Sequence, residues 1–262
     1  MKNLIRILSA LCLLFSAAAS AQEEGEVDIA LVLAVDVSNS MDREEQELQR
    51  QGFIDAFRSS LVHEAVRDGM LGRIAVAYVE WAGEGEQKLV VPWTVIEGAE
   101  TANRFADRLQ SAPISRARRT SISGAIDFGV RLLGESNVDA LRQVIDISGD
   151  GATNRGRPVM DARDEAVAKG ITVNGLPIML KKPRSYWDIE DLDLYYRDCV
   201  IGGQGAFMVP VRERHQFAEA IKTKIIREIA GPVEVPLIQP AQAEPGMNCL
   251  VAQRPRLDQW RN

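Results

Sequence analysis

Residues 29–40 read IALVLAVDVSNS, an apolar run of seven residues followed by one carboxylate and two hydroxyls at alternate positions. The apolar run predicts a strand buried on both faces, and the amphipathic pattern after it predicts a helix. Asp36, Ser38 and Ser40 therefore stand where a buried strand passes into a helix, with their oxygens directed to one place. Oxygen ligands grouped in this way suit a hard divalent cation.

The rest of the chain alternates apolar runs with amphipathic stretches, which is typical of a parallel sheet with helices on both faces. Gly83 and Gly85 predict a hairpin and hence one antiparallel edge strand. The predicted fold is α/β, a Rossmann-like three-layer sandwich with a mostly parallel central sheet, one antiparallel edge strand and helices on both faces. We expect strands near 29–35, 74–81, 88–93, 143–148, 171–179 and 206–211, and helices near 42–66, 99–109, 120–133, 159–169 and 213–229.

Residues 1–21 predict a signal peptide that is not part of this fold. Lys2 and Arg6 give a positive start, residues 7–18 are apolar, and the small residues 19–21 form a cleavage site. A retained membrane anchor is the alternative, but the apolar run is shorter than the roughly 20 residues that a membrane span needs. We therefore expect a secreted protein, periplasmic or extracellular in a bacterium, with no integral membrane anchor after cleavage.

The composition suits one globular domain with a sizeable core, since 46% of the 262 residues are hydrophobic and 26% are charged. Loss of the signal peptide removes two basic residues and no acidic residue, which changes the net charge from −6 to −8. An acidic chain is not expected to bind nucleic acid or anionic membranes. We assign residues 22–232 to the domain and residues 233–262 to an irregular C-terminal tail.

Two cysteines, Cys199 and Cys249, remain after removal of the signal peptide. Two thiols in an oxidising compartment most often pair. A bond between these two would tie the C-terminal tail to the body of the domain. The alternative, which the sequence leaves open, is a pair of free thiols.

Polar residues follow three of the expected segments. Asp36, Ser38 and Ser40 follow the first strand, Thr120 ends the loop before a helix, and Asp150 follows strand 143–148. Because ligands bind where the carboxyl ends of parallel strands meet, we expect these five side chains to lie together. At this point the chain resembles the von Willebrand factor type A domain over about residues 27–230. The metal-ion-dependent adhesion site of that family combines an Asp-x-Ser-x-Ser loop with a Thr and an Asp from two later loops, and the five residues match in order.

A second stretch extends this resemblance. Residues 195–203, YYRDCVIGG, followed by Ala206 and Phe207, are similar to a subfamily of secreted bacterial type A proteins that has no assigned function. The likeness implies the fold and the compartment, and it implies nothing about a partner.

The chemistry of the five side chains agrees with a magnesium site. Mg²⁺ takes octahedral oxygen ligation and keeps several waters beside one or two carboxylates. Ser38, Ser40 and Thr120 offer hydroxyls, whereas Asp36 and Asp150 bind the ion directly or orient its waters. The low net charge leaves room for an Asp or Glu of an unidentified partner protein, and Mn²⁺ or Ca²⁺ are alternative ions. The competing interpretation is an Asx-turn and helix cap with no ion.

The charged residues near these motifs can each be interpreted in two ways. Arg116, Arg118 and Arg119 stand just before Thr120 and predict a cationic rim that steers an acidic partner to the ion. The alternative is a solvated loop whose charges contribute little. Asp146 lies inside an expected strand, where it either turns towards the site or is a buried acid with polar partners, and we favour the structural role.

The sequence favours a binding protein over an enzyme. Its two histidines, His63 and His215, fall in helical patterns away from the polar loops, so no imidazole is placed to activate a serine. We expect a metal-dependent adhesion or assembly module. The alternative is a metal-free structural subunit of an envelope complex, and a metal-dependent hydrolase, which would normally need more acidic ligands, is the weaker third hypothesis.

Overall fold

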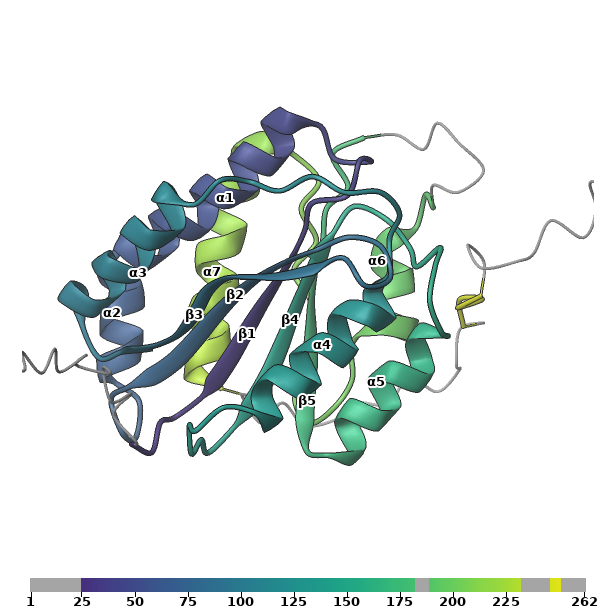
Figure 1. The fold of residues 1–262 in the computed structure, drawn as a ribbon. Coiled ribbons are helices and arrows are strands. Elements are labelled where there is room, and N and C mark those ends of the chain that lie inside the picture. The colour runs from purple at the N-terminus through teal and green to yellow at the C-terminus, as the bar shows by residue number, and fades with distance from the viewer. Residues whose placement is uncertain (1–24, 182–188, 232–245, 251–262) are drawn as a thin grey trace, which may run out of the picture.

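The computed structural model describes residues 25–181, 189–231 and 246–250. Its centre is a five-stranded sheet with the strand order β3-β2-β1-β4-β5 (Figure 1). Neighbouring strands are parallel except β2 and β3, so the predicted mostly parallel sheet with one antiparallel edge strand is confirmed. The strands are β1 (Ala30–Asp36), β2 (Ile74–Trp81), β3 (Gln87–Ile96), β4 (Gln143–Gly149) and β5 (Ile171–Pro177).

Helices cover both faces of the sheet, as predicted (Figure 1). One face carries α1 (Arg43–Arg58), α2 (Ser60–Arg67), α3 (Ala99–Ser111) and α7 (Phe217–Ala230). The other face carries α4 (Ile122–Gly134), α5 (Val159–Ala168) and α6 (Leu192–Tyr195), which continues into a π-helical turn, η1 (Tyr196–Val200). A 3₁₀ turn, η2 (Arg214–Gln216), leads into α7.

The sheet separates the apolar core into two layers, and the side chains of β1 point alternately into each. Leu31 and Leu33 pack under α1 and α7, whereas Ala30, Val32 and Ala34 face the α4 and α5 side. This alternation follows from the two-residue period of a strand. Because every residue of β1 is buried, the carboxyl end of this strand delivers Asp36 to the rim of the sheet in a fixed position.

The expected helix over 42–66 is interrupted. Asp42 and Glu45 form a capping box at the start of α1, but Ser59 is extended and caps α2, where its hydroxyl accepts the N–H of Leu61. Leu61, which follows the break, is 50% exposed. His63 of α2 is buried, with its Nε2 2.8 Å from the carbonyl oxygen of Phe57.

The expected strand over 206–211 is not a regular strand. This segment runs along β5 through hydrogen bonds that join Phe207, Val209 and Val211 to residues 175–179. Pro177 interrupts the ladder, because a proline nitrogen has no hydrogen to donate. The segment therefore pairs with β5 only at isolated bridges.

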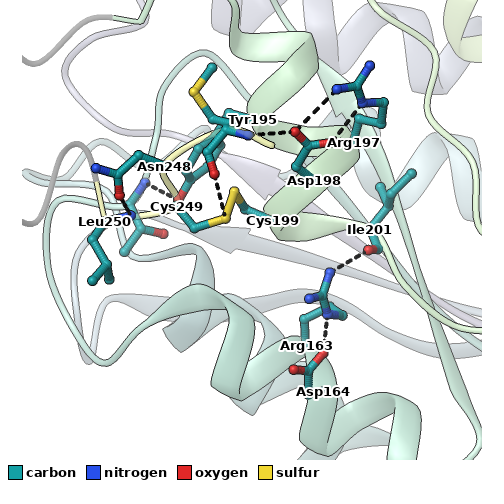
Figure 2. Close-up of a disulfide and its surroundings, with 12 residues drawn as sticks. Arg163, Asp164, Tyr195, Arg197, Asp198, Cys199, Ile201, Asn248, Cys249 and Leu250 are labelled. Atoms are coloured by element: carbon teal, nitrogen blue, oxygen red, sulfur yellow. Dashed lines mark hydrogen bonds and ion pairs between the residues drawn. A yellow bond between two sulfur atoms is a disulfide. The ribbon is translucent and has the colours of Figure 1, made fainter. Parts of the chain in front are cut away.

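Cys199 and Cys249 form a disulfide (Figure 2). Beside it the backbone N–H of Met247 donates to Asp198 at 2.8 Å, so residues 246–250 are fastened to η1 twice. The predicted signal peptide (residues 1–21), and the predicted tail apart from residues 246–250, lie outside the described residues. Among the helices that the structure describes, none is both long and apolar enough to cross a membrane.

Candidate functional site

Asp36 is the most deeply placed of the five predicted site residues. It ends β1 and is 0% exposed. Its Oδ1 accepts the N–H of Ser38 at 2.7 Å, which is the Asx-turn that the competing interpretation expected. At its Oδ2, however, no group among the described residues meets hydrogen-bonding geometry. A turn alone therefore leaves one buried carboxylate oxygen without a partner.

A chain of hydrogen bonds leads from this loop to the third one. The Oγ atoms of Ser38 and Ser40 lie 2.8 Å apart, and Ser40 donates to Asp150 Oδ1 at 2.6 Å. Ser38 is buried, Ser40 is exposed and Asp150 is half-buried. The structure thus brings two carboxylates and two hydroxyls together in a site that is closed at Asp36 and open to solvent at Ser40.

Thr120 is tied to the site through its backbone. Its N–H donates to Asn154 Oδ1 at 3.0 Å, and its carbonyl accepts the N–H groups of Asn154 and Arg155, so it is bound to the loop that begins at Asp150. Arg119, just before it, is the one non-glycine residue with positive φ (74°) in the described part of the chain. A side chain in that region of φ is strained, and such strain is commonly found at functional sites.

Electrostatics at this rim disfavour the ionised form of Asp36. Burial first, and the nearby charge of Asp150 second, raise the pKa of Asp36 well above its ordinary value. The backbone N–H groups of Ser38 and Asp150 oppose this shift without cancelling it. Two close carboxylates that cannot easily ionise together are a pair that a bound cation would stabilise.

Gly149 keeps the space around the unpartnered oxygen open. A Cβ atom at this position would lie 3.0 Å from Asp36 Oδ2 and 3.1 Å from the hydroxyl of Tyr196. Tyr196 comes from η1, within the stretch that the sequence singled out for its family likeness. It is buried, and burial together with the charge of Asp36 raises the pKa of its hydroxyl, so this phenol stays neutral beside the carboxylate.

Sequence reasoning missed Lys181, which follows β5. Its Nζ donates to the carbonyl oxygen of Ser40 at 2.9 Å, pairs with Glu45 and lies 3.4 Å from Asp42 Oδ2. Lys181 thus joins the Ser40 loop to the capping box of α1. A lone lysine with no surrounding motif gave no signal that could have placed it there.

A buried ion pair between Arg50 and Glu80 was also missed. Arg50 donates to the carbonyl oxygens of Leu109 and Ala112, and Glu80 accepts the N–H of Ser115 at 3.0 Å. These bonds fix the end of α3 and the start of the loop that carries the predicted arginine rim. Arg50 belongs to the helical pattern of α1, in which an inward-facing arginine cannot be told from an exposed one.

The arginine rim lies at the surface beside the site. Arg116, Arg118 and Arg119 are exposed, and no ion pair joins them to an acidic side chain within the described residues. The loop is held by a hydrogen bond from the N–H of Ala117 to the carbonyl oxygen of Val37 at 3.2 Å. The three arginines line a shallow cavity of about 510 Å³, whose lining also includes Glu84 and Glu86.

Other titratable candidates lie elsewhere. Asp146 faces α7, where its Oδ1 is 2.8 Å from Lys224 Nζ, which agrees with the structural role that we favoured. His215 is exposed and lies 3.1 Å from Glu213. No group of three or more His, Cys, Asp or Glu side chains in the described ranges is arranged to hold a metal ion. The donor set at the rim differs from such a group, because it consists of two carboxylates and several hydroxyls.

Solved structures show what the fold is similar to. The chain superposes on proximal thread matrix protein 1 of the mussel byssus, with a zinc-occupied metal-ion-dependent adhesion site, at a TM-score of 0.52 and 15% identity, over 76% of this chain and 48% of that chain. The pilus adhesin SpaC from Lactobacillus rhamnosus GG, in an open conformation, gives 0.57 and 12% over 78% and 30%. A von Willebrand factor type A protein from Catenulispora acidiphila gives 0.54 and 12% over 78% and 43%.

These matches show the fold alone, because the identities are low. The chain spans about half the length of the mussel protein and less than half the length of the other two. No curated protein matches the chain by sequence. A family model described as "Protein of unknown function (DUF1194)" matches residues 26–233. The chain therefore belongs to this family of unknown function, and its fold is that of the von Willebrand factor type A domain.

Proposed function

We propose that this protein is a secreted, periplasmic or extracellular binding module that captures an acidic side chain of a partner protein through a divalent cation. The observation that carries the proposal is the Oδ2 atom of Asp36, which is buried beside a second carboxylate and meets no hydrogen-bonding geometry with any of the described residues. A buried carboxylate needs a counter-charge, a proton or a full set of hydrogen bonds. A cation held at the rim would supply that counter-charge.

The donor set fits Mg²⁺. Asp36 and Asp150 would hold the ion directly or through oriented waters, and Ser38, Ser40 and Thr120 would add hydroxyl oxygens. Mn²⁺ and Ca²⁺ also accept oxygen ligands, so they are the substitutes to test. The space that Gly149 leaves beside Asp36 and Tyr196 supports this assignment, because a larger residue there would fill it.

The partner is expected to be acidic. Two carboxylates leave a site with a divalent ion at low net charge. An Asp or Glu of the partner could therefore add a third carboxylate from the exposed side of the site, at Ser40. The exposed residues Arg116, Arg118 and Arg119 add positive charge beside that opening and would speed association with an acidic surface. The ion would then act as a shared ligand, with no bond made or broken in the partner.

Binding is favoured over catalysis by the placement of the histidines. His63 lies on the buried face of α2, where its Nε2 contacts a backbone carbonyl, and His215 lies beside an exposed glutamate. Neither is described near Ser38 or Ser40, so no nucleophile and base are assembled there. A hydrolase would have to rely on the ion alone to activate water.

A metal-free structural subunit of an envelope complex is the second candidate. One observation favours it, because Ser40 already donates to Asp150 and Asp36 already closes an Asx-turn, so much of the site is bonded internally. This alternative leaves the second oxygen of Asp36 unexplained.

Equilibrium dialysis against Mg²⁺, followed by metal analysis of the protein, separates the two candidates. We expect the wild type to retain about one ion per chain at saturation and Asp36→Ala to retain none above background. Glu100→Ala, which changes an exposed acid on α3, is the matched control and should bind like the wild type. Equal metal content in the wild type and Asp36→Ala would refute the metal site.

A further inference from the structure

A groove of about 700 Å³ lies between α2 and α7, and its lining is mainly apolar. We call it the α2–α7 groove. Leu61, Met70 and Leu141 line it while being 50%, 86% and 48% exposed, and Ile226 of α7 contributes to its floor. Several large apolar side chains exposed together mark a surface that another molecule covers.

The groove and the candidate metal site lie at opposite ends of the parallel strands. Met70 precedes β2 and Leu141 precedes β4, so the groove lies at the amino ends of parallel strands. Asp36 and Asp150 lie at the carboxyl ends of β1 and β4. One molecule can therefore engage two neighbours at once without the two surfaces competing.

The lining of the groove carries three acidic residues and one arginine, Arg142, whose guanidinium is engaged by the carbonyl oxygens of Glu228 and Ile229. Glu64 of α2 and Asp68, the C-cap residue of that helix, are exposed one turn apart, and neither forms an ion pair in the described part of the chain. Asp28 also lines the groove, but it is buried and accepts the N–H of Leu71 at 2.9 Å. The groove thus fits a segment that combines apolar side chains with positive charge.

The chain exposes a segment of that kind beside the candidate metal site, at the carboxyl ends of the strands. Residues 113–119 read PISRARR, with Pro113 exposed, Ile114 half-buried and three exposed arginines. The segment borders the candidate metal site, because Ala117 is bonded to Val37 within the Asp36 loop. An interface that places this loop in the groove of another copy would bring opposite charges together and cover the exposed apolar side chains.

We propose that copies of this protein associate head to tail, with the loop over residues 113–119 of one copy seated in the α2–α7 groove of the next. This contact carries Glu64 and Asp68 of the second copy towards Ser40 and Asp150 of the first, where one carboxylate completes the coordination of the ion. The proposal deepens the proposed function and rests on it, since it names a second copy as the acidic partner. The contact uses two different surfaces, so it repeats along an open chain of molecules instead of closing as a two-fold dimer.

Sedimentation velocity on the mature chain tests this, over a wide concentration range in Mg²⁺ and in EDTA. We expect association that increases with concentration and is at least about tenfold weaker in EDTA. Two variants each remove one surface: Leu61→Ser with Met70→Ser changes the groove, and Arg116→Ser with Arg118→Ser changes the loop. Each should stay monomeric alone, and because all four residues are exposed, an unchanged melting temperature will show that both variants fold.

Mixing the two variants is the decisive arm. The intact loop of the groove variant can still enter the intact groove of the loop variant, so an equimolar mixture should form a 1:1 dimer that grows no further. A mixture that stays monomeric, or a wild type that is monomeric in Mg²⁺ while dialysis shows the ion bound, would overturn this proposal and leave the proposed function standing. Absence of bound Mg²⁺ in the dialysis experiment would instead defeat the proposed function, and with it the metal-linked contact.

Discussion

Asp36 and Asp146 are two buried carboxylates on neighbouring central strands, and they differ in whether a cationic side chain lies beside them. They are 0% and 2% exposed, and burial raises the pKa of each. Lys224 of α7 places its Nζ 2.8 Å from Asp146 Oδ1, at ion-pair distance though not in hydrogen-bond alignment. The second oxygen of Asp36 has no such partner within the described residues.

The difference separates an acid that serves the fold from one that is available to a ligand. Lys224 also lies 2.5 Å from Glu228 Oε1, and Glu228 in turn accepts from Asn174 at 2.7 Å, so this cluster fastens α7 to β4 and β5. Burial alone would lower the pKa of Lys224, but the two carboxylates raise it and keep the amine charged. The protein supplies a cation to Asp146, whereas under the proposed function Asp36 would take one from solution.

Removing the internal cation should have the largest effect. Lys224→Met leaves Asp146 and Glu228 buried without a counter-charge, and we expect the free energy of unfolding to fall by about 3–5 kcal/mol. Urea denaturation measures this. Lys222→Met, which breaks an ion pair with the exposed residue Glu219 on the same helix, is the control and should change the free energy by less than about 1 kcal/mol. Similar effects for both would show that the buried cluster is not stabilising.

The two carboxylates should respond oppositely to neutralisation. In EDTA, Asp36→Asn removes a buried charge that no cationic side chain of the described residues balances, so we expect the free energy of unfolding to rise by about 1 kcal/mol. Asp146→Asn should lower it, because Lys224 then loses a partner in the core. Urea melts of both variants beside the wild type give the two signs. Destabilisation by Asp36→Asn in EDTA would mean that the protein already satisfies Asp36.

The contribution of Asp36 should also depend on pH. Its pKa is higher in the folded state than in the unfolded chain, so the folded state binds the proton more tightly. The buried charge of Asp36 therefore does not destabilise the folded state at a pH below 3.8, the ordinary pKa of an Asp. Its destabilising effect grows as the pH rises and is complete above the raised pKa of the folded state. The stability difference between the wild type and Asp36→Asn in EDTA should narrow as the pH is lowered from neutrality. A difference that stays constant across this range would contradict the account.

The fold could be predicted from the sequence because its central strands are strongly patterned. Residues 29–35 are uniformly apolar, and the alternation of such runs with amphipathic stretches specified the parallel sheet. The errors arose where one residue overrode the pattern. Ser59 split the first helix by capping a second one, and Pro177 removed a hydrogen bond from the ladder expected over residues 206–211.

The site was predictable in part. The order of Asp36, Thr120 and Asp150 along the chain follows the family motif, and the structure brings the loops of all three to one rim. Lys181 and the pairing of Lys224 with Asp146 were not foreseen, because ion pairs between residues far apart in sequence depend on the packing of whole helices.

The stability of the wild type and Asp36→Asn, with and without Mg²⁺ at constant ionic strength, tests most directly the claim that Asp36 awaits a cation. Binding to the folded state alone should raise the free energy of unfolding of the wild type by about 2.7 kcal/mol at a Mg²⁺ concentration one hundred times the Kd. We predict this increase for the wild type and no increase for Asp36→Asn. An equal increase in both proteins, or none in the wild type, would contradict it.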